Sequence, residues 1–278
     1  MSVFRSGARA LITGAGSGVG LAVAQLCAKS GMSVTLVDID RTRLETAKST
    51  IQQSTQANVD IHDMDVSSLS AWTDLSNKVA KQPLDLLMLN AGIGAKGSWT
   101  DNDYFHKIFD TNVFGVVNGI NTFFPRFANP ESNVSKSIVI TGSKQGITNP
   151  PGNAAYNASK SAIKTLAEHL SYDLRQVSNV SVHLLVPGWT FTGLTGGGGT
   201  KTKPDGAWDP SQVADYLYQK MKEEKFYVIC PDNDVTFETD QKRMLWTAGD
   251  IVYERPPLSR WREDWKEKAA EGVKNTKI

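Results

Sequence analysis

The sequence predicts an α/β fold in which about seven parallel strands form a doubly wound sheet with helices on both faces. One observation is that short apolar runs alternate along the chain with longer segments of helical periodicity. A second is that several runs, such as "ALIT" at 10–13 and "SVTLVD" at 33–38, are apolar without strict alternation. Strands of a parallel sheet have this character because helices bury both of their faces.

The expected elements follow one another at the spacing of strand–helix–strand units. We expect strands at 10–13, 33–38, 58–66, 85–92, 137–143, 180–188 and 225–231, and helices near 18–30, 40–54, 68–81, 101–128, 154–177 and 210–224. No linker interrupts them, so we expect a single domain over 1–231. Residues 193–209 contain a four-glycine run without hydrophobic periodicity and predict a mobile lid. The extension at 232–278 is rich in Trp and Pro, and we expect it to pack on the domain or on a second subunit.

Composition excludes several classes of partner. The 278 residues carry a net charge of +1, which argues against nucleic acid as a dominant electrostatic partner. Cys27 and Cys230 are too few for a disulfide framework or a zinc site, and no metal site is expected. No segment has the features of a signal peptide, and no run approaches the roughly 18 apolar residues of a membrane span. We therefore expect a cytoplasmic protein without a membrane partner.

The segment "TGAGSGVG" at 13–20 directly follows the first strand and opens a helix. Glycines allow a tight turn and close approach of a ligand, and the helix N-terminus offers N–H groups to a pyrophosphate. Asp38, at the end of the second strand, can accept hydrogen bonds from both ribose hydroxyls of a dinucleotide and repels a 2′-phosphate. No arginine immediately follows Asp38, and the next is Arg41, so the pattern favours NAD(H) over NADP(H). A simple tight turn and a solvated charge are the alternative interpretations.

The stretch "AYNASK" at 155–160 places Tyr156 and Lys160 four residues apart on one helical face. An ammonium about 4 Å from a phenolate would stabilise it by about 4 kcal/mol at an effective dielectric near 20. That energy would lower the tyrosine pKa from about 10 toward roughly 7, where the phenol can exchange a proton with an alcohol or carbonyl oxygen. In isolation such a pair is usually an ordinary surface pair. Ser143 lies thirteen residues before Tyr156, at the end of the strand predicted at 137–143. Its hydroxyl could polarise the same substrate oxygen.

Over about residues 8–192 the chain resembles the short-chain dehydrogenase/reductase family. The motifs that carry the resemblance are "TGAGSGVG", Asp38, "DV" at 65–66, "NAG" at 90–92, "TNVFG" at 111–115, Ser143, "YNASK" and "PG" at 187–188. The glycine spacing is that of the family's simpler single-domain enzymes, which implies a Rossmann fold. The glycine-rich ending common in the family is missing, which leaves the closure of the substrate site and the subunit geometry open.

The resemblance also implies roles for individual residues. Tyr156 would act as general acid or base, Lys160 would lower its pKa and hold the nicotinamide ribose, and Ser143 would orient the substrate oxygen. Asn112, within the helix predicted at 101–128, would hold a water molecule that links Lys160 to solvent. The cofactor-binding positions are Gly14, Ser17, Gly18, Val19, Gly20, Asp38, Asp65, Val66, Asn90, Ala91, Gly92, Tyr156, Lys160, Pro187, Gly188, Thr190 and Thr192.

These residues predict an NAD(H)-dependent oxidoreductase that interconverts a secondary alcohol and a ketone. Trp99, Trp189, Phe191 and Trp208 fall near segments expected around the site and suggest a hydrophobic, aromatic or alicyclic substrate, although they could equally pack in the core or lid. The resemblance implies a homodimer or homotetramer. Two alternatives remain: an NAD(H)-binding scaffold or redox sensor without turnover, and an isomerase or dehydratase that uses bound NAD transiently.

Overall fold

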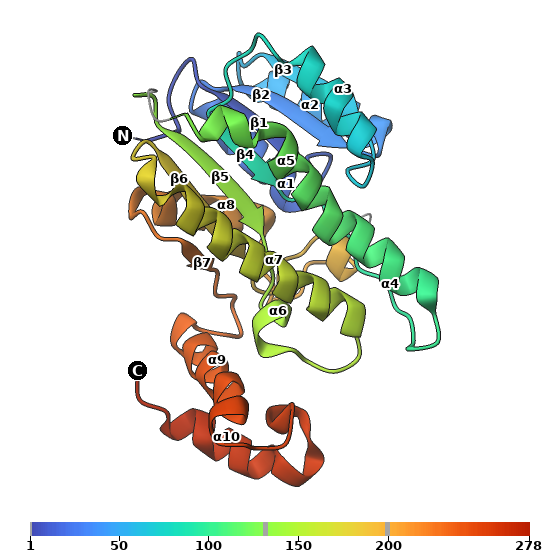
Figure 1. Cartoon of the computed structure of the whole chain (residues 1–278), viewed down its shortest axis with the longest axis vertical. Coiled ribbons are helices and arrows are strands. Elements are labelled where there is room, and N and C mark those ends of the chain that lie inside the picture. Colours follow the sequence, from blue (N-terminus) through green and yellow to red (C-terminus); the bar gives the residue numbers. More distant parts are fainter. Residues whose placement is uncertain (1, 130–132, 198–200) are drawn as a thin grey trace.

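The computed structural model describes residues 2–129, 133–197 and 201–278, and it has the predicted doubly wound sheet (Figure 1). Seven parallel strands lie in the order β3-β2-β1-β4-β5-β6-β7. They are β1 (Arg9–Thr13), β2 (Ser33–Asp38), β3 (Val59–Asp63), β4 (Leu86–Leu89), β5 (Lys136–Thr141), β6 (Val180–Val186) and β7 (Tyr227–Ile229). The strand order reverses between β1 and β4, the point where open α/β sheets form a ligand crevice at their carboxyl edge.

Helices cover both faces of the sheet and explain why the strands are apolar throughout. One face packs against α1 (Gly18–Lys29), α2 (Arg41–Ser54) and α8 (Pro210–Lys222), and the other against α3 (Leu69–Lys78), α5 (Gly115–Phe127) and α7 (Ala154–Asp173). Ile12 of β1 belongs to the first core, whereas its neighbour Leu11 belongs to the second. Successive side chains of a strand point to opposite faces, so both must be apolar.

Strands β1 and β2 end at the predicted residues, whereas the others end earlier at their carboxyl side than the sequence predicts. β3 ends at Asp63, β4 at Leu89, β5 at Thr141 and β6 at Val186, each two or three residues before the predicted limit. The residues that leave the hydrogen-bonded ladder are those of the "DV", "NAG", "GS" and "PG" motifs. Their apolar or small character extends the pattern of the strand, yet their backbones diverge to form the rim of the crevice.

The helix predicted at 101–128 contains an irregularity that the sequence does not show. It consists of α4 (Asn102–Phe109), a π-helical turn over Asp110–Phe114, and α5. Asn112 lies in that π-helical turn. Turns of this kind are rare and often mark functional sites because they re-aim one side chain out of the helical register.

The extension after Pro231 is helical, which the sequence analysis did not predict. It contains α9 (Phe237–Val252) and α10 (Lys266–Asn275), which lie beyond the carboxyl edge of the sheet, next to the short helix α6 (Gln145–Thr148) (Figure 1). The Trp246 indole packs against Gly272 and donates a hydrogen bond to Ser259 Oγ at 2.8 Å. Trp261 Nε1 donates to the Thr148 carbonyl at 3.2 Å, so the extension contacts α6.

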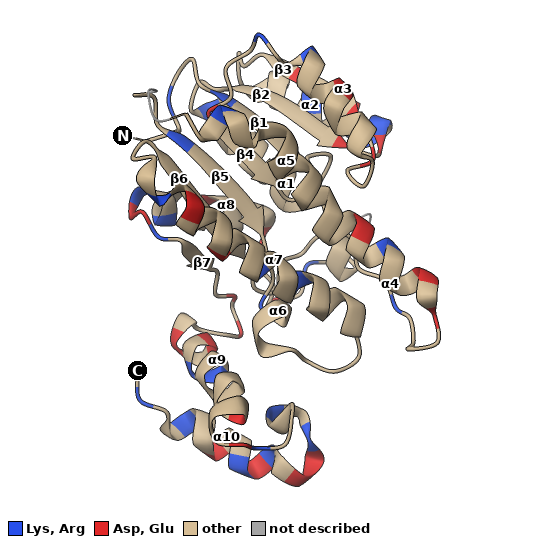
Figure 2. Ribbon diagram, viewed as in Figure 1, with Lys and Arg blue, Asp and Glu red and all other residues tan. Residues whose placement is uncertain are grey.

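Charged residues are unevenly distributed over the surface. Figure 2 shows them on α2, on α3 and on the extension, whereas α5 carries Arg126 as its one charged residue. None of the helices in the described ranges is long and apolar enough to span a membrane.

Candidate active site

A cleft of about 1090 Å³ lies at the carboxyl edge of the sheet and receives residues from the ends of six strands. Its wall contains every predicted cofactor-binding residue except Gly20, namely Gly14, Ser17, Gly18, Val19, Asp38, Asp65, Val66, Asn90, Ala91, Gly92, Tyr156, Lys160, Pro187, Gly188, Thr190 and Thr192. Ser143 also lines it, whereas Asn112 and Gly20 lie behind the wall. The fold therefore gathers the predicted set in one place.

The glycine turn leaves no room for side chains. Gly14 and Gly18 have φ values of +64° and +56°, which favour glycine. A Cβ atom on Gly20 would lie 2.3 Å from the Gly14 carbonyl oxygen, so the turn could not close over any larger residue. Ser17 begins α1 without a capping hydrogen bond from its side chain, which leaves the first-turn N–H groups available to an anion.

Asp38 lies against this turn. Its carboxylate accepts hydrogen bonds from the backbone N–H groups of Gly16 at 3.0 Å and Asp40 at 3.1 Å. Arg41 turns away and pairs with Glu45 and Asp63, but Arg43 lines the cleft and pairs with Asp40 at 3.1 Å. Proximity in the sequence to Asp38 points to Arg41 rather than to Arg43. Arg43 lies in the first turn of α2, which places it near the end of β2. This placement could have been inferred from helical periodicity.

Two threonines that the sequence analysis missed hold the cleft wall together. Thr13 Oγ1 accepts hydrogen bonds from the backbone N–H groups of Asn90 at 2.9 Å and Ala91 at 3.0 Å. Thr141 Oγ1 donates to Asn90 Oδ1 at 3.1 Å. Asn90 is thereby fixed between β1 and β5. Both threonines are the last residues of their strands, which is the signal that could have identified them.

Lys160 is a buried residue of the cleft wall, and Tyr156 lies on the same side of α7. Only 5% of Lys160 is exposed, and its ammonium donates to the Thr141 carbonyl at 2.9 Å. Burial lowers the pKa of Lys160 to about 8. Burial also raises the pKa of Tyr156, an effect that a hydrogen bond with Ser143 partly opposes. The Lys160 ammonium lies 5.8 Å from the centre of the Tyr156 ring.

The predicted acidity of Tyr156 stays a prediction. A lysine about 4 Å away would lower the tyrosine pKa, but desolvation is the largest influence on the pKa of Tyr156, and Lys160 is not among the groups that shift it. The lysine directs its ammonium to a backbone carbonyl, and it is itself poorly solvated. Sequence spacing placed the two side chains on one face correctly, but it contains no information on how deeply that face is buried.

Asn112 holds the loop after β4. Its Oδ1 accepts from the Ile93 N–H at 2.8 Å, and its Nδ2 donates to the Ile93 carbonyl at 3.0 Å and to Ser159 Oγ at 3.1 Å. A Cβ on Gly92 would meet both Asn112 Oδ1, at 3.2 Å, and the Lys160 ammonium, at 3.5 Å. One lone pair of Asn112 Oδ1 remains for another donor. The predicted water link from Lys160 stays a prediction, and the geometry leaves an acceptor for it.

The profile of the short chain dehydrogenase family matches residues 8–202. The chain belongs to this family. A crystal structure of a short-chain dehydrogenase/reductase from Burkholderia phymatum in complex with NAD is 28% identical, with a TM-score of 0.81 over 92% of this chain and 98% of that one. Among relatives, the sulfoacetaldehyde reductase of Chromohalobacter salexigens is 29% identical over 87% of this chain and 97% of its own length. The 1-deoxy-11-beta-hydroxypentalenate dehydrogenase of Streptomyces avermitilis is 29% identical over 85% and 89%.

The aromatic residues expected around the site of this short-chain dehydrogenase are dispersed. Trp189 lines the cleft, but Trp99 is 83% exposed and packs on Phe105, and Trp208 packs on Tyr216 beside the core. The cleft is instead lined by four polar residues spaced as one stripe of α4 and the turn after it, which the sequence analysis missed: Asp103, His106, Lys107 and Asp110. The sequence predicted the segments around the site but not the direction of each side chain.

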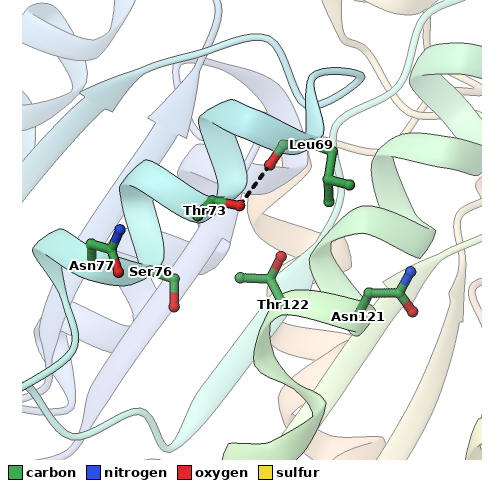
Figure 3. Close-up of a pocket in the computed structure, with 6 residues that line it drawn as sticks. All are labelled: Leu69, Thr73, Ser76, Asn77, Asn121 and Thr122. Carbon is green, nitrogen blue, oxygen red and sulfur yellow. Dashed lines mark hydrogen bonds between the residues drawn. The ribbon is translucent and has the colours of Figure 1, made fainter.

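Another surface hollow lies between α3 and α5, outside this cleft (Figure 3). Its lining is uncharged and consists of Leu69, Thr73, Ser76, Asn77, Asn121 and Thr122. Nothing in that lining resembles an acid, a base or a nucleophile with an activating partner, so the chemistry of the dehydrogenase is to be sought in the large cleft.

The buried ammonium of Lys160 predicts an unusual dependence of stability on pH. Its folded-state pKa lies below the ordinary lysine value of 10.5, so burial costs stability fully below pH 8 and not at all above pH 10.5. Burial of the ammonium lowers the free energy of unfolding by on the order of 3 kcal/mol. Replacing Lys160 would recover this energy, but the loss of its hydrogen bond to Thr141 would cost about 1 kcal/mol. We expect Lys160→Met to stabilise the cofactor-free protein by about 1–2 kcal/mol at pH 7, with the gain vanishing by pH 10.5.

Denaturant unfolding at pH 7 and near pH 10.5 measures this effect. Lys164→Met is the matched control, because Lys164 lies one turn later on α7 and is partly exposed beside Glu168. The control should show no such gain at pH 7. Equal destabilisation by Lys160→Met at both pH values would contradict the assignment of a desolvated ammonium.

Proposed function

We propose that this short-chain dehydrogenase interconverts a secondary alcohol and a ketone with NAD(H) as the hydride carrier. The observation that carries the proposal is that Ser143, Tyr156 and Lys160 line the same cleft as the glycine turn and Asp38. A proton-transfer group and a dinucleotide cradle are thus within one cavity. That combination fits hydride transfer coupled to proton transfer, and the oxidoreductase membership of the family supports it.

The residues present fit a dinucleotide. The turn at Gly14 and Gly20 is too tight for side chains and leads to uncapped N–H groups, which suits a pyrophosphate. The Asp38 carboxylate lines the cleft beside that turn, so it would accept hydrogen bonds from ribose hydroxyls, and its charge disfavours a 2′-phosphate. The Burkholderia phymatum relative was crystallised with NAD, which supports the same preference. When bound, NAD+ supplies the acceptor for the hydride.

Three side chains of the cleft transfer the proton, position the substrate and supply a positive charge. Tyr156 takes the hydroxyl proton during alcohol oxidation and returns it during ketone reduction. Ser143, hydrogen-bonded to that phenol, donates to the substrate oxygen and fixes its position. Lys160 adds a positive charge at the wall of the cleft, and its lowered pKa lets it exchange protons with solvent near pH 8. Each role uses a group that already lines the cleft.

The substrate end of the cleft is bounded by apolar groups. Trp189, Ile93 and Leu194 line it, and a Cβ on Gly94 would lie 3.3 Å from Leu194, so the two loops approach each other there. We therefore propose a substrate with a hydrophobic, aromatic or alicyclic body at the carbinol carbon. The polar stripe of α4 is available to a hydrophilic substituent. We further propose a cytoplasmic homodimer or homotetramer, which the low charge of α5 would suit.

A scaffold or sensor that binds NAD(H) without turnover is the competing function. Such a protein would have no use for a buried lysine whose desolvation costs stability. A panel of aromatic, alicyclic and aliphatic secondary alcohols, assayed with NAD+ and NADP+, separates the two. Formation of reduced cofactor with one alcohol class supports the enzyme, and cofactor binding without turnover across the panel would favour the scaffold.

Tyr156→Phe tests the assignment of the proton-transfer group. Removal of the hydroxyl leaves the ring packing intact, so NADH should still bind, measured by fluorescence titration. Turnover should fall by about 10²–10⁴-fold, the usual contribution of a general acid or base. Tyr172→Phe, on an exposed position of the same helix, is the control and should retain full activity. Wild-type rates in Tyr156→Phe would refute the role.

Asp38→Ala tests the cofactor preference. Loss of charged hydrogen bonds to the ribose should lower kcat/KM with NAD+ by about 10- to 100-fold. Loss of repulsion should raise or preserve the value with NADP+, since Arg43 lies beside the same site. Asp63→Ala, on the neighbouring strand β3, is the control. A wild-type enzyme that prefers NADP+ would overturn the preference.

A further inference from the structure

A largely buried ionic cluster lies next to Ser143, and none of its residues has a role in the proposed reaction. The Lys144 ammonium contacts Asp240 Oδ2 at 2.5 Å and Asp232 Oδ2 at 3.3 Å. The side chains are 16% exposed for Lys144, 5% for Asp232 and 3% for Asp240. Exposed ion pairs contribute little to structure, whereas a buried cation between two carboxylates fixes the position of all three groups. We call these three residues the lysine hub.

The lysine hub joins three segments that surround the reacting end of the cleft. Lys144 directly follows Ser143, and the backbone between them leads into α6. Asp232 Oδ2 also accepts from the Trp189 N–H at 2.9 Å, which fixes the loop after β6. Asp240 lies in the first turn of α9, so it anchors the extension. The fold brings each segment to the carboxyl edge, and the hub connects them.

The segment around Asp232 also reaches the predicted lid. Asp232 Oδ1 accepts from the N–H groups of Asp234 at 3.1 Å and Val235 at 2.8 Å, which shapes a tight turn. Within that turn the Asn233 N–H donates to the Gly206 carbonyl at 3.0 Å. A Cβ on Gly206 would overlap the Asp234 carboxylate, so the two segments are in close contact. The same turn therefore touches the hub, the loop after β6 and the lid.

We propose that the lysine hub is a positioning device for the active site, through which the C-terminal extension holds Ser143 and the loop at 188–190 in their working geometry. The inference rests on the proposed function, because it assigns Lys144, Asp232 and Asp240 to the support of that reaction. None of the three is a catalytic residue. Lys144 acts through Ser143, its neighbour in the chain, and Asp232 acts through the Trp189 N–H.

Direct recognition of the substrate by Lys144 fits the geometry less well. Lys144 lines the cleft, but its charge is already balanced by two carboxylates that lie within ion-pair distance. Ser143, by contrast, depends on its local backbone: its Oγ accepts from the Gln145 N–H at 3.1 Å, in the turn that Lys144 anchors.

Asp240→Asn is the mildest test, since Lys144 keeps Asp232 as its partner. Lys144→Met removes the cation, and Lys144→Arg preserves it. Glu238→Gln is the matched control, because Glu238 lies in the same turn of α9, pairs with Lys242 at 2.8 Å and is 68% exposed at its side chain. We expect faster backbone hydrogen exchange at 142–149 and 187–192 in Asp240→Asn and Lys144→Met, but not in Glu238→Gln.

Kinetics separate positioning from a purely structural role. Displacement of Ser143 by about 1 Å should lower kcat by about 10- to 100-fold in Asp240→Asn, with the KM for NAD+ little changed. Lys144→Arg should recover most of the activity lost in Lys144→Met. If Lys144→Met does not fold, Asp240→Asn and Lys144→Arg still carry the test.

Several results would overturn the inference. Unchanged exchange in both segments would refute it, as would faster exchange with wild-type kcat, because the hub would then stabilise without positioning. A higher KM for substrate at constant kcat would assign Lys144 to substrate binding instead. If the wild-type protein oxidises no alcohol, the proposed function fails, and the hub is judged by the exchange measurement alone.

Discussion

The hydrogen bond from the Lys160 ammonium to the Thr141 carbonyl is the interaction on which the candidate site depends. It links the end of strand β5 to the helix α7 and holds the cation at the wall of the cleft. Because all strands are parallel, their carboxyl ends meet at this edge, and the loops after them must diverge there. The topology thus creates the cleft, and the buried lysine gives one part of it an electrostatic character.

Burial makes the charged forms of Lys160 and Tyr156 unfavourable. Both members of the pair have pKa values shifted toward their neutral forms, Lys160 downward and Tyr156 upward. Active sites often keep such strained groups at a cost in stability, since the same desolvation strengthens their interactions with charge that develops during reaction. Lys144 of the lysine hub directly follows Ser143 in the chain. It is partly exposed and is paired with two carboxylates, and the role that we propose for it is positioning rather than proton transfer.

The sequence predicted the sheet, the helices and the membership of the cleft because each leaves a local pattern. Periodicity identifies α7, glycine spacing identifies the turn at Gly14, and motif order identifies Ser143 and Tyr156. The depth at which a side chain is buried and the direction in which it points leave no such pattern in the sequence. The raised pKa of Tyr156, the approach of Arg43 and the exposure of Trp99 all depend on packing between distant segments. The helices α9 and α10 were missed because the extension was interpreted from its Trp and Pro residues, of which only Trp246 lies within either helix.

The pH dependence of turnover in both directions tests the central claim most directly. If Tyr156 exchanges the proton with substrate, kcat/KM for alcohol oxidation must rise with pH, since the phenolate is the base. The value for ketone reduction must fall over the same range, since the phenol is the acid. The account predicts opposite slopes with a shared apparent pKa, which belongs to the coupled Tyr156–Lys160 pair. Parallel slopes in the two directions, or no dependence between pH 6 and pH 10, would contradict it.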